Sequence, residues 1–377
     1  YSFLNKSFRM GDVMKKRVLN GIDVLDIEKL KASNIALVIN YSSVNQKGEH
    51  LLDILMRSAI KVVRIFTPEH GLFLNADGQK IEDFIHPRYR IPVTSIYGSR
   101  FTLDCDLLHD VDVVIYDIQD VGLRYYTFIY ALAEVVKECA KCRKKLVVLD
   151  RFNPLGRRFF GPRIPQTLNS IVGAYELPVR YGLSTGELAL YYKKFFGLDV
   201  EIDIIKCVGW SGEDFSKIDT FWNVPSPNLP TFSSLICYAG LCLFEATNLS
   251  VGRGTTKPFE FIGAPWLDED EMYTYLKGKF PNMLFRKRQF IPQFREYAYQ
   301  VCNGLEFVPS PEDNFFEVAV AILEYLQGYE EFEVNNKRID MLAGVENFME
   351  SKDQLLNFNL NDYFEFISDV LLYKNED

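Results

Sequence analysis

The sequence has 377 residues, more than one hydrophobic core usually serves, so it predicts two domains. Hydrophobic residues make up 48% of the chain and charged residues 25%, a balance typical of globular rather than disordered proteins. The formal net charge of −9 argues against a general nucleic-acid-binding protein, which is normally basic. No run of about 18 apolar residues occurs, so we expect no membrane span.

The cysteines and histidines predict neither a metal site nor a disulfide framework. The seven cysteines are odd in number and most lie in apolar runs, so we expect buried free thiols. Cys139 and Cys142 form a C-x-x-C motif, but it falls inside a predicted helix that ends in basic residues, which argues against a redox role. No Cys/His cluster has zinc spacing, and no nucleotide-binding glycine motif follows a strand, so no cofactor is expected.

The first half of the chain alternates short apolar runs with helical patterns. Strands are predicted at residues 35–40, 62–66, 111–116, 145–149 and 200–207. Helices are predicted at residues 51–59, 128–141 and 184–196, and the last of these opens on a capping box formed by Ser184 and Glu187. Buried strands that alternate with helices indicate an α/β fold with a mostly parallel sheet covered on both faces.

The second half is more mixed and begins after a proline-rich stretch. Residues 224–230 contain Pro225, Pro227 and Pro230, which cannot continue a helix or a central strand. We therefore place the domain junction there, with a first domain at residues 17–228 and a second at 229–377. Helices are predicted in the second domain at residues 268–279, 315–327 and 361–373.

Polar residues follow four of the predicted strands at the point where each strand ends. In parallel sheets ligands bind beyond the carboxyl ends of the strands, so these residues should meet at one edge of the sheet. The candidates are Asn40, then Glu69 and His70, then Asp117, Gln119, Asp120, Arg124 and Tyr126, and finally Asp150, Arg151 and Asn153.

Glu69 is the leading catalytic candidate among them. It follows Pro68, which fixes the backbone, and it precedes His70 and Gly71, of which the glycine can adopt conformations closed to other residues. A carboxyl group held by such a stiff loop can serve as a general acid. The alternative is a structural glutamate that caps the next element or pairs with Arg64.

Asp117 and Asp120 are candidates for the second carboxylate that glycoside hydrolysis usually needs. Alternatively, Asp117 caps the turn while Asp120 pairs with Arg124. Arg124 or Arg151 could bind a substrate carboxylate with two hydrogen bonds, or either could form a supporting ion pair.

A glycine-rich stretch in the second half, residues 252–260, has the wrong spacing for a phosphate-binding loop. We interpret it as a rigid loop that presents Arg253 and Glu260 to the cleft between the domains. A purely structural loop remains the alternative.

Several of these stretches resemble the exo-β-N-acetylmuramidase family of the NamZ type. The matching segments are TPEHG at residues 67–71, YDIQDVGLRYYT at 116–127, LDRFNP at 149–154, GLSTGELA at 182–189, PSPNLPT at 225–231, FEATNLSVGRGTTKPFE at 244–260 and IGAPW at 262–266. Their order and spacing fit most of the chain.

The resemblance implies a Rossmann-like catalytic domain, a smaller mixed α+β domain and a site in the cleft between them. It implies hydrolytic release of terminal β-1,4-linked N-acetylmuramic acid from peptidoglycan fragments, without metal or nucleotide. Glu69 takes the leading catalytic position. Further site positions implied by the resemblance are the segment 117–126, Arg151, Asn228, Arg253 and Glu260. Peptidoglycan-derived muropeptides or MurNAc-GlcNAc saccharides as substrates suggest a periplasmic or secreted enzyme, although recycling of imported fragments would fit the cytoplasm.

The sequence departs from the family pattern near Leu74, at Tyr181, where a histidine is expected, and at Ser211, where an arginine is usual. These departures leave two alternatives open, a divergent paralogue acting on another amino sugar and a cell-wall sugar-binding protein without catalysis.

Overall fold

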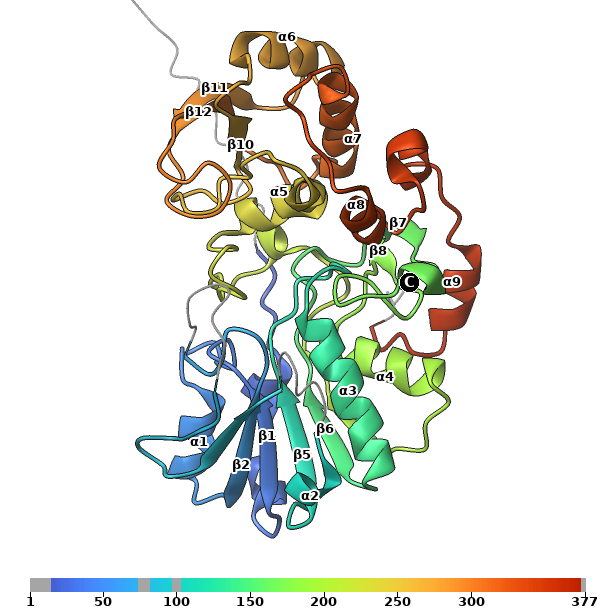
Figure 1. The fold of residues 1–377 in the computed structure, drawn as a ribbon. Coiled ribbons are helices and arrows are strands. Elements are labelled where there is room, and N and C mark those ends of the chain that lie inside the picture. Colours follow the sequence, from blue (N-terminus) through green and yellow to red (C-terminus); the bar gives the residue numbers. More distant parts are fainter. Residues whose placement is uncertain (1–14, 74–81, 97–102, 374–377) are drawn as a thin grey trace, which may run out of the picture.

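The computed structural model describes residues 15–73, 82–96 and 103–373, which form a lower and an upper lobe in Figure 1. The lower lobe is built on a seven-stranded sheet in the order β3-β4-β2-β1-β5-β6-β9. All neighbours in this sheet are parallel except β3, which pairs antiparallel with β4. Its strands are β1 (Ile35–Ile39), β2 (Val62–Thr67), β3 (Phe84–Ile85), β4 (Pro92–Ser95), β5 (Val113–Asp117), β6 (Lys145–Leu149) and β9 (Ile202–Ile205).

The six parallel strands follow the order of a doubly wound Rossmann-like sheet, in which the chain starts at the centre and the strand order reverses between β1 and β5. The predicted α/β class and mostly parallel sheet are therefore confirmed. The sequence did not reveal β4, because only Val93 among its four residues is an apolar strand former.

Helices cover both faces of this sheet because the side chains of its strands alternate. On β1, Ala36 and Val38 pack in one core with α3 (Phe128–Lys141), while Leu37 packs in another core with α1 (Leu51–Arg57). Helix α4 (Thr185–Phe195) contacts α3 and β6, and both hydrogen bonds of the predicted capping box, between Ser184 and Glu187, are present. A short helix, α2 (Cys105–Leu108), precedes β5.

The upper lobe contains a three-stranded antiparallel sheet in the order β10-β12-β11. Its elements are α5 (Phe232–Leu241), β10 (Phe261–Ala264), α6 (Glu269–Lys279), β11 (Phe285–Phe290), β12 (Cys302–Phe307), α7 (Phe315–Leu326) and α8 (Asn336–Ala343). Helices α5 and α7 cross closely at Gly240, where an added Cβ would lie 1.8 Å from the carbonyl oxygen of Phe315. Among the described residues, no helix combines the length and apolar character needed to cross a membrane.

The C-terminal segment returns to the lower lobe through α9 (Asn361–Ile367), which ends earlier than the helix predicted to residue 373. The hydroxyl group of Tyr363 donates to the carbonyl oxygen of Tyr181 at 2.9 Å, and the hydroxyl group of Tyr373 donates to Asp150. The second domain proposed from the sequence, residues 229–377, thus includes a segment that packs on the first. A two-stranded sheet of β7 (Phe160–Arg163) and β8 (Pro178–Arg180) lies between the lobes near α8 (Figure 1).

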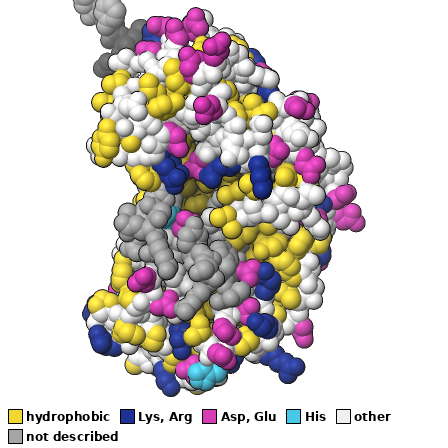
Figure 2. Space-filling view, in the orientation of Figure 1, with side chains coloured by type: hydrophobic (Ala, Val, Ile, Leu, Met, Phe, Trp, Pro, Cys, Tyr) yellow, Lys and Arg dark blue, Asp and Glu magenta, His cyan; other side chains and the backbone are white. Residues whose placement is uncertain are grey.

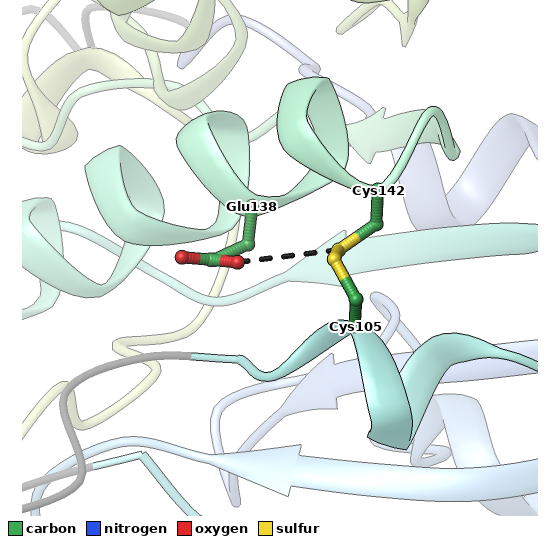
Figure 3. Close-up of side chains that lie close together, drawn as sticks. All are labelled: Cys105, Glu138 and Cys142. Carbon is green, nitrogen blue, oxygen red and sulfur yellow. Dashed lines mark hydrogen bonds between the residues drawn. A yellow bond between two sulfur atoms is a disulfide. The ribbon is translucent and has the colours of Figure 1, made fainter.

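Two of the cysteines expected to be free thiols form a disulfide instead. Cys105 on α2 and Cys142 at the end of α3 are bonded, with their Cα atoms 5.4 Å apart (Figure 3). The prediction of free thiols is therefore wrong for this pair, because an apolar pattern does not show that the two helix termini meet. Cys139, Cys207, Cys237, Cys242 and Cys302 are buried free thiols, as predicted.

We expect reduction of this disulfide to destabilise the protein. The bonded residues are 37 positions apart, and a loop of that length corresponds to a stabilisation of about 4 kcal/mol. Urea unfolding should show this loss when a reductant is added to the wild type, whereas the Cys105→Ser variant should already be destabilised and insensitive to reductant. Equal stability of the wild type with and without reductant would contradict the expectation.

Candidate active site

A cavity of about 300 Å³ lies between the two lobes, beyond the carboxyl ends of β2 and β5. Figure 2 shows a hollow between the lobes, with Lys and Arg side chains gathered along its upper edge. The lining residues of the lower lobe are Glu69, His70, Tyr125, Tyr126, Thr127, Ser170, Ile171 and Val172. The remaining lining residues are Ser226, Asn228, Leu229, Tyr238, Glu245, Arg253, Phe259, Arg295, Arg338 and Met341.

Glu69 enters the cavity from a tight turn at the end of β2. His70 and Gly71 both have a φ of 68°, and the Gly71 N–H donates to the carbonyl oxygen of Pro68 at 3.1 Å. The glycine was expected to adopt such a conformation, but the left-handed backbone at His70 was not. The Glu69 carboxylate accepts a hydrogen bond of 2.6 Å from the Thr127 hydroxyl group, in place of the considered pairing with Arg64. This contact fixes the half-buried carboxyl group at the cavity wall.

The opposite wall is cationic. Glu245 accepts hydrogen bonds from Arg253 at 2.6 Å and from Arg338 on α8 at 3.2 Å. Arg295 lines the same cavity. Of these four residues only Arg253 was predicted from the sequence. Nothing in the sequence pattern marks the others, because only the fold brings residues 245, 295 and 338 together.

The proline-rich stretch closes one side of the cavity. Tyr126, a predicted site residue that lines the cavity, donates a hydrogen bond of 2.6 Å to the carbonyl oxygen of Pro225. Tyr41 donates to the same oxygen. These bonds hold Asn228, another predicted residue, at the cavity wall.

Asp117 lies outside the cavity. Its carboxylate accepts two hydrogen bonds from Arg151, at 2.6 and 3.0 Å, and the exposed fractions of the two side chains are 0% and 1%. Gln119 packs beside this pair and donates to the carbonyl oxygens of Asp120 at 2.8 Å and Phe152 at 3.1 Å. Asp117 and Arg151 therefore form a buried ion pair at the end of β5, while Gln119 and Arg151 line a second pocket that does not contain Glu69.

The crevice between the ends of β1 and β5, where doubly wound folds bind nucleotides, is bridged by serines. Ser43 donates to the carbonyl oxygen of Asp117, and Ser42 accepts from the Gln119 N–H at 3.0 Å. Asn40, a predicted binding residue, accepts from the Ser42 N–H and hydroxyl group at 2.9 and 2.6 Å. Its side chain therefore holds this turn and does not line the cavity.

Asp120 is buried behind the cavity wall. It accepts a hydrogen bond from the hydroxyl group of Tyr181 and one of 3.0 Å from the Gly122 N–H. Burial raises its pKa to about 7, because an ionised carboxylate loses its hydration there. Tyr181 is itself fully buried, so the departure at this position changes the partner of Asp120 and not the cavity wall.

The sequence also departs from the family pattern at Ser211 and near Leu74. The Ser211 hydroxyl group accepts a hydrogen bond from Lys16 and donates one to Glu213, and Leu74 lies outside the described residues.

The raised pKa of Asp120 predicts a pH-dependent stability. Between about pH 4, where a carboxyl group ionises in the unfolded chain, and about pH 7, the folded protein retains a proton that the unfolded chain has released. The free energy of unfolding should therefore fall as the pH rises through this window. We expect a flatter profile for Asp120→Asn in urea titrations, and the same slope in both proteins would contradict this assignment.

Three further predicted residues serve the framework. The buried Arg124 guanidinium donates to the carbonyl oxygens of Pro162, Leu177 and Leu342 at 3.1, 3.2 and 2.8 Å, so it links the lobes and does not reach the cavity. Asp120, the partner considered from the sequence, bonds to Tyr181 and Gly122 instead. The Asn153 amide donates to the carbonyl oxygen of Leu183 at 3.1 Å. Glu260 accepts from Thr231, Ser234 and Lys257 at 3.0, 3.0 and 3.1 Å.

Among the described residues, one group has the spacing of a metal site, formed by Cys105, Glu138 and Cys142, whose ligand atoms lie within 4.8 Å of one another. Its two sulfur atoms are bonded, so they cannot both serve as thiolate ligands (Figure 3). The group lies at the far end of α3, whose 14 residues separate it from Thr127 at the cavity by roughly 20 Å.

Comparison with known proteins identifies the family. Residues 35–233 match the N-terminal family model of exo-beta-N-acetylmuramidase NamZ, and residues 236–359 match its C-terminal model. The peptidoglycan beta-N-acetylmuramidase NamZ of Bacillus subtilis (strain 168) is 35% identical over 343 residues, which cover 88% of this chain and 83% of that protein.

Two solved structures of DUF1343 family proteins from Bacteroides fragilis NCTC 9343 have the same fold. Their TM-scores are 0.85 and 0.75, each at 24% identity, over 96% and 95% of this chain and 100% and 99% of theirs. At this identity they support the fold alone. Because the two family models together span most of the sequence, the chain belongs to the exo-β-N-acetylmuramidase NamZ family.

Proposed function

We propose that this protein is an exo-β-N-acetylmuramidase, a glycosidase that releases terminal N-acetylmuramic acid from the non-reducing ends of peptidoglycan fragments. The observation that carries the proposal is the single cavity that brings Glu69 together with the arginine cluster of Arg253, Arg295 and Arg338. Membership of the NamZ family and the activity in the name of the Bacillus relative support it.

The arginine cluster provides the recognition of muramic acid. This sugar differs from N-acetylglucosamine by a lactyl ether that carries a carboxylate, and arginine binds carboxylates through paired, charge-assisted hydrogen bonds. Glu245 holds Arg253 and Arg338 on one wall, so the two guanidinium groups have a fixed spacing. These arginines take the role that the sequence suggested for Arg124 or Arg253.

Glu69 acts as the general acid. Its carboxyl group protonates the glycosidic oxygen while the bond from that oxygen to C1 of the muramic acid breaks. The Thr127 hydroxyl group, which donates to one carboxylate oxygen, orients the other towards the substrate. After departure of the saccharide, the Glu69 carboxylate accepts a proton from the water that attacks C1.

The N-acetyl group of the substrate supplies the second catalytic group. Asp117 and Asp120 are both buried outside the cavity, so neither is positioned to contact the sugar. The carbonyl oxygen of the N-acetyl group therefore bonds to C1 as the leaving group departs, and water then opens this cyclic intermediate. Two displacements at C1 retain the β configuration of the released sugar.

A substrate pair tests the assignment. The wild type should release N-acetylmuramic acid from MurNAc-GlcNAc and from a chromogenic β-N-acetylmuramide, and should hydrolyse the matching β-N-acetylglucosaminide poorly. Arg338→Gln should lower kcat/KM for the muramide by about tenfold to a hundredfold, because a charge-assisted hydrogen bond is lost, and should leave the slow glucosaminide reaction unchanged. Equal hydrolysis of both substrates by the wild type would contradict recognition of the lactyl group.

The Cys105–Cys142 disulfide supports a location outside the reducing cytoplasm. Disulfides persist in the periplasm and outside the cell, where peptidoglycan fragments also occur. We therefore propose that the enzyme is periplasmic or secreted and acts on muropeptides or MurNAc-GlcNAc saccharides.

A further inference from the structure

Residues 291–301 form a loop, the roof loop, that brings Arg295 to the cavity. It joins β11 to β12 and is fastened to the loop that carries Arg253. The Gln293 N–H donates to the carbonyl oxygen of Gly254 at 3.0 Å, and an added Cβ at Gly254 would lie 2.5 Å from the Phe294 nitrogen. The two loops therefore form one wall of the cavity.

The roof loop is held in an energetically costly conformation. Arg295, Tyr297 and Tyr299 have φ values of 68°, 57° and 66°, a left-handed backbone conformation that is strained for residues other than glycine. A hydrogen bond of 2.8 Å from Trp266 to the Tyr297 hydroxyl group and one of 2.7 Å from the Tyr299 N–H to the carbonyl oxygen of Pro292 maintain it. Backbone that is strained and held in this way is typical of functional segments.

The roof loop exposes several apolar side chains beside its polar residues Gln293 and Gln300. The exposed fractions of Tyr299, Ile291, Val301 and Phe294 are 79%, 53%, 50% and 40%. Tyr299 has the highest value of the large hydrophobic residues that the structure describes as exposed. In Figure 2, hydrophobic side chains gather on the left side of the upper lobe, above the hollow. Grouped exposed apolar side chains of this kind mark binding surfaces.

The cavity is large enough for one sugar only, so the rest of the substrate must bind outside it. Its volume of about 300 Å³ is at the small end of the range of ligand sites and suits one amino sugar. In an exo-acting enzyme that sugar is the terminal muramic acid, so the saccharide on the other side of the scissile bond must lie beyond the cavity. The roof loop runs from the cavity at Arg295 to the surface at Tyr299, where the exposed aromatic ring of Tyr299 is available for contact.

We infer that the roof loop binds the leaving saccharide, with Tyr299 stacking on a sugar ring beyond the scissile bond. The apolar C–H face of a pyranose ring matches an aromatic face, while its hydroxyl groups stay in water. The enzyme then acts more efficiently on oligosaccharide fragments than on substrates with a small leaving group. This inference rests on the proposed glycosidase function.

Three substrates of increasing length test it, namely the chromogenic muramide, MurNAc-GlcNAc and the tetrasaccharide (MurNAc-GlcNAc)₂. In Tyr299→Ala, the ratio of kcat/KM for the tetrasaccharide to kcat/KM for the chromogenic muramide should fall about tenfold, as expected for loss of one aromatic contact. Tyr299→Trp should restore the ratio, because it restores a ring. Leu284→Ala is the matched control, because Leu284 is 63% exposed at the opposite end of β11.

Two results would overturn the inference, an unchanged ratio in Tyr299→Ala and an equal loss on all three substrates, which would indicate a general structural role. Failure of the proposed function is separately visible, because the wild type would then leave the chromogenic muramide intact.

Discussion

Replacing Glu69 by glutamine should abolish most of the turnover of MurNAc-GlcNAc while leaving the fold intact. Glutamine keeps the size of the side chain and its hydrogen bond with Thr127 but cannot deliver a proton to the glycosidic oxygen. General acid catalysis contributes about 10²- to 10⁴-fold, so kcat should fall by that factor and KM should change little. Steady-state release of N-acetylmuramic acid measures both constants.

A carboxylate far from the cavity provides the control for this variant. Glu201 pairs with Lys145 at the sheet edge, and its side chain is 65% exposed. Glu201→Gln should therefore retain wild-type kinetics. If Glu69→Gln, correctly folded by circular dichroism, also retained wild-type turnover, another group would have to protonate the leaving oxygen.

Replacing Asp117 by alanine should have the largest effect on stability. The change leaves the Arg151 guanidinium buried at 1% exposure without its carboxylate partner. Breaking a buried ion pair from one side costs about 3–5 kcal/mol, because the remaining charge has neither hydration nor a counter-ion. Urea unfolding should show this loss as a shift of the midpoint.

A control variant distinguishes a structural role of Asp117 from a catalytic one. Asp203→Asn breaks a pair between Lys145 and a half-exposed carboxylate and should cost less than about 1 kcal/mol. If the Asp117→Ala protein remained fully stable but lost all turnover, the Asp117 carboxylate would have a catalytic role and not a structural one.

The sequence predicted elements and strand ends well because hydrophobic periodicity depends on local burial. The predicted limits of α3 and β6 agree with the structure at every residue, and the parallel arrangement followed from alternating apolar runs. Short strands such as β4 were not predicted, because they contain too few apolar residues. The Cys105–Cys142 disulfide was not predicted, because the approach of these two residues depends on tertiary structure.

The residues of the candidate site could likewise be predicted only where the signal is local. Residues that follow strands could be identified as polar, but whether a side chain turns towards the cavity or into the interior depends on its neighbours. Glu69 and Tyr126 line the cavity, whereas Arg124 is directed towards three carbonyl oxygens. Arg338 comes from a surface helix of the other lobe and has no local sequence signal at all.

The return of the C-terminal segment to the lower lobe has a mechanical consequence. The polypeptide crosses between the lobes twice, once through the proline-rich stretch at residues 224–230 and again between α8 and α9, so the upper lobe is inserted into the lower one. Both ends of the upper lobe are therefore joined covalently to the lobe that carries Glu69, and one continuous hydrophobic core contains residues of both lobes, such as Val135 and Leu235. Unfolding of the upper lobe alone would expose this shared core to water, so we expect the two lobes to unfold together and the arginine wall to stay fixed relative to Glu69.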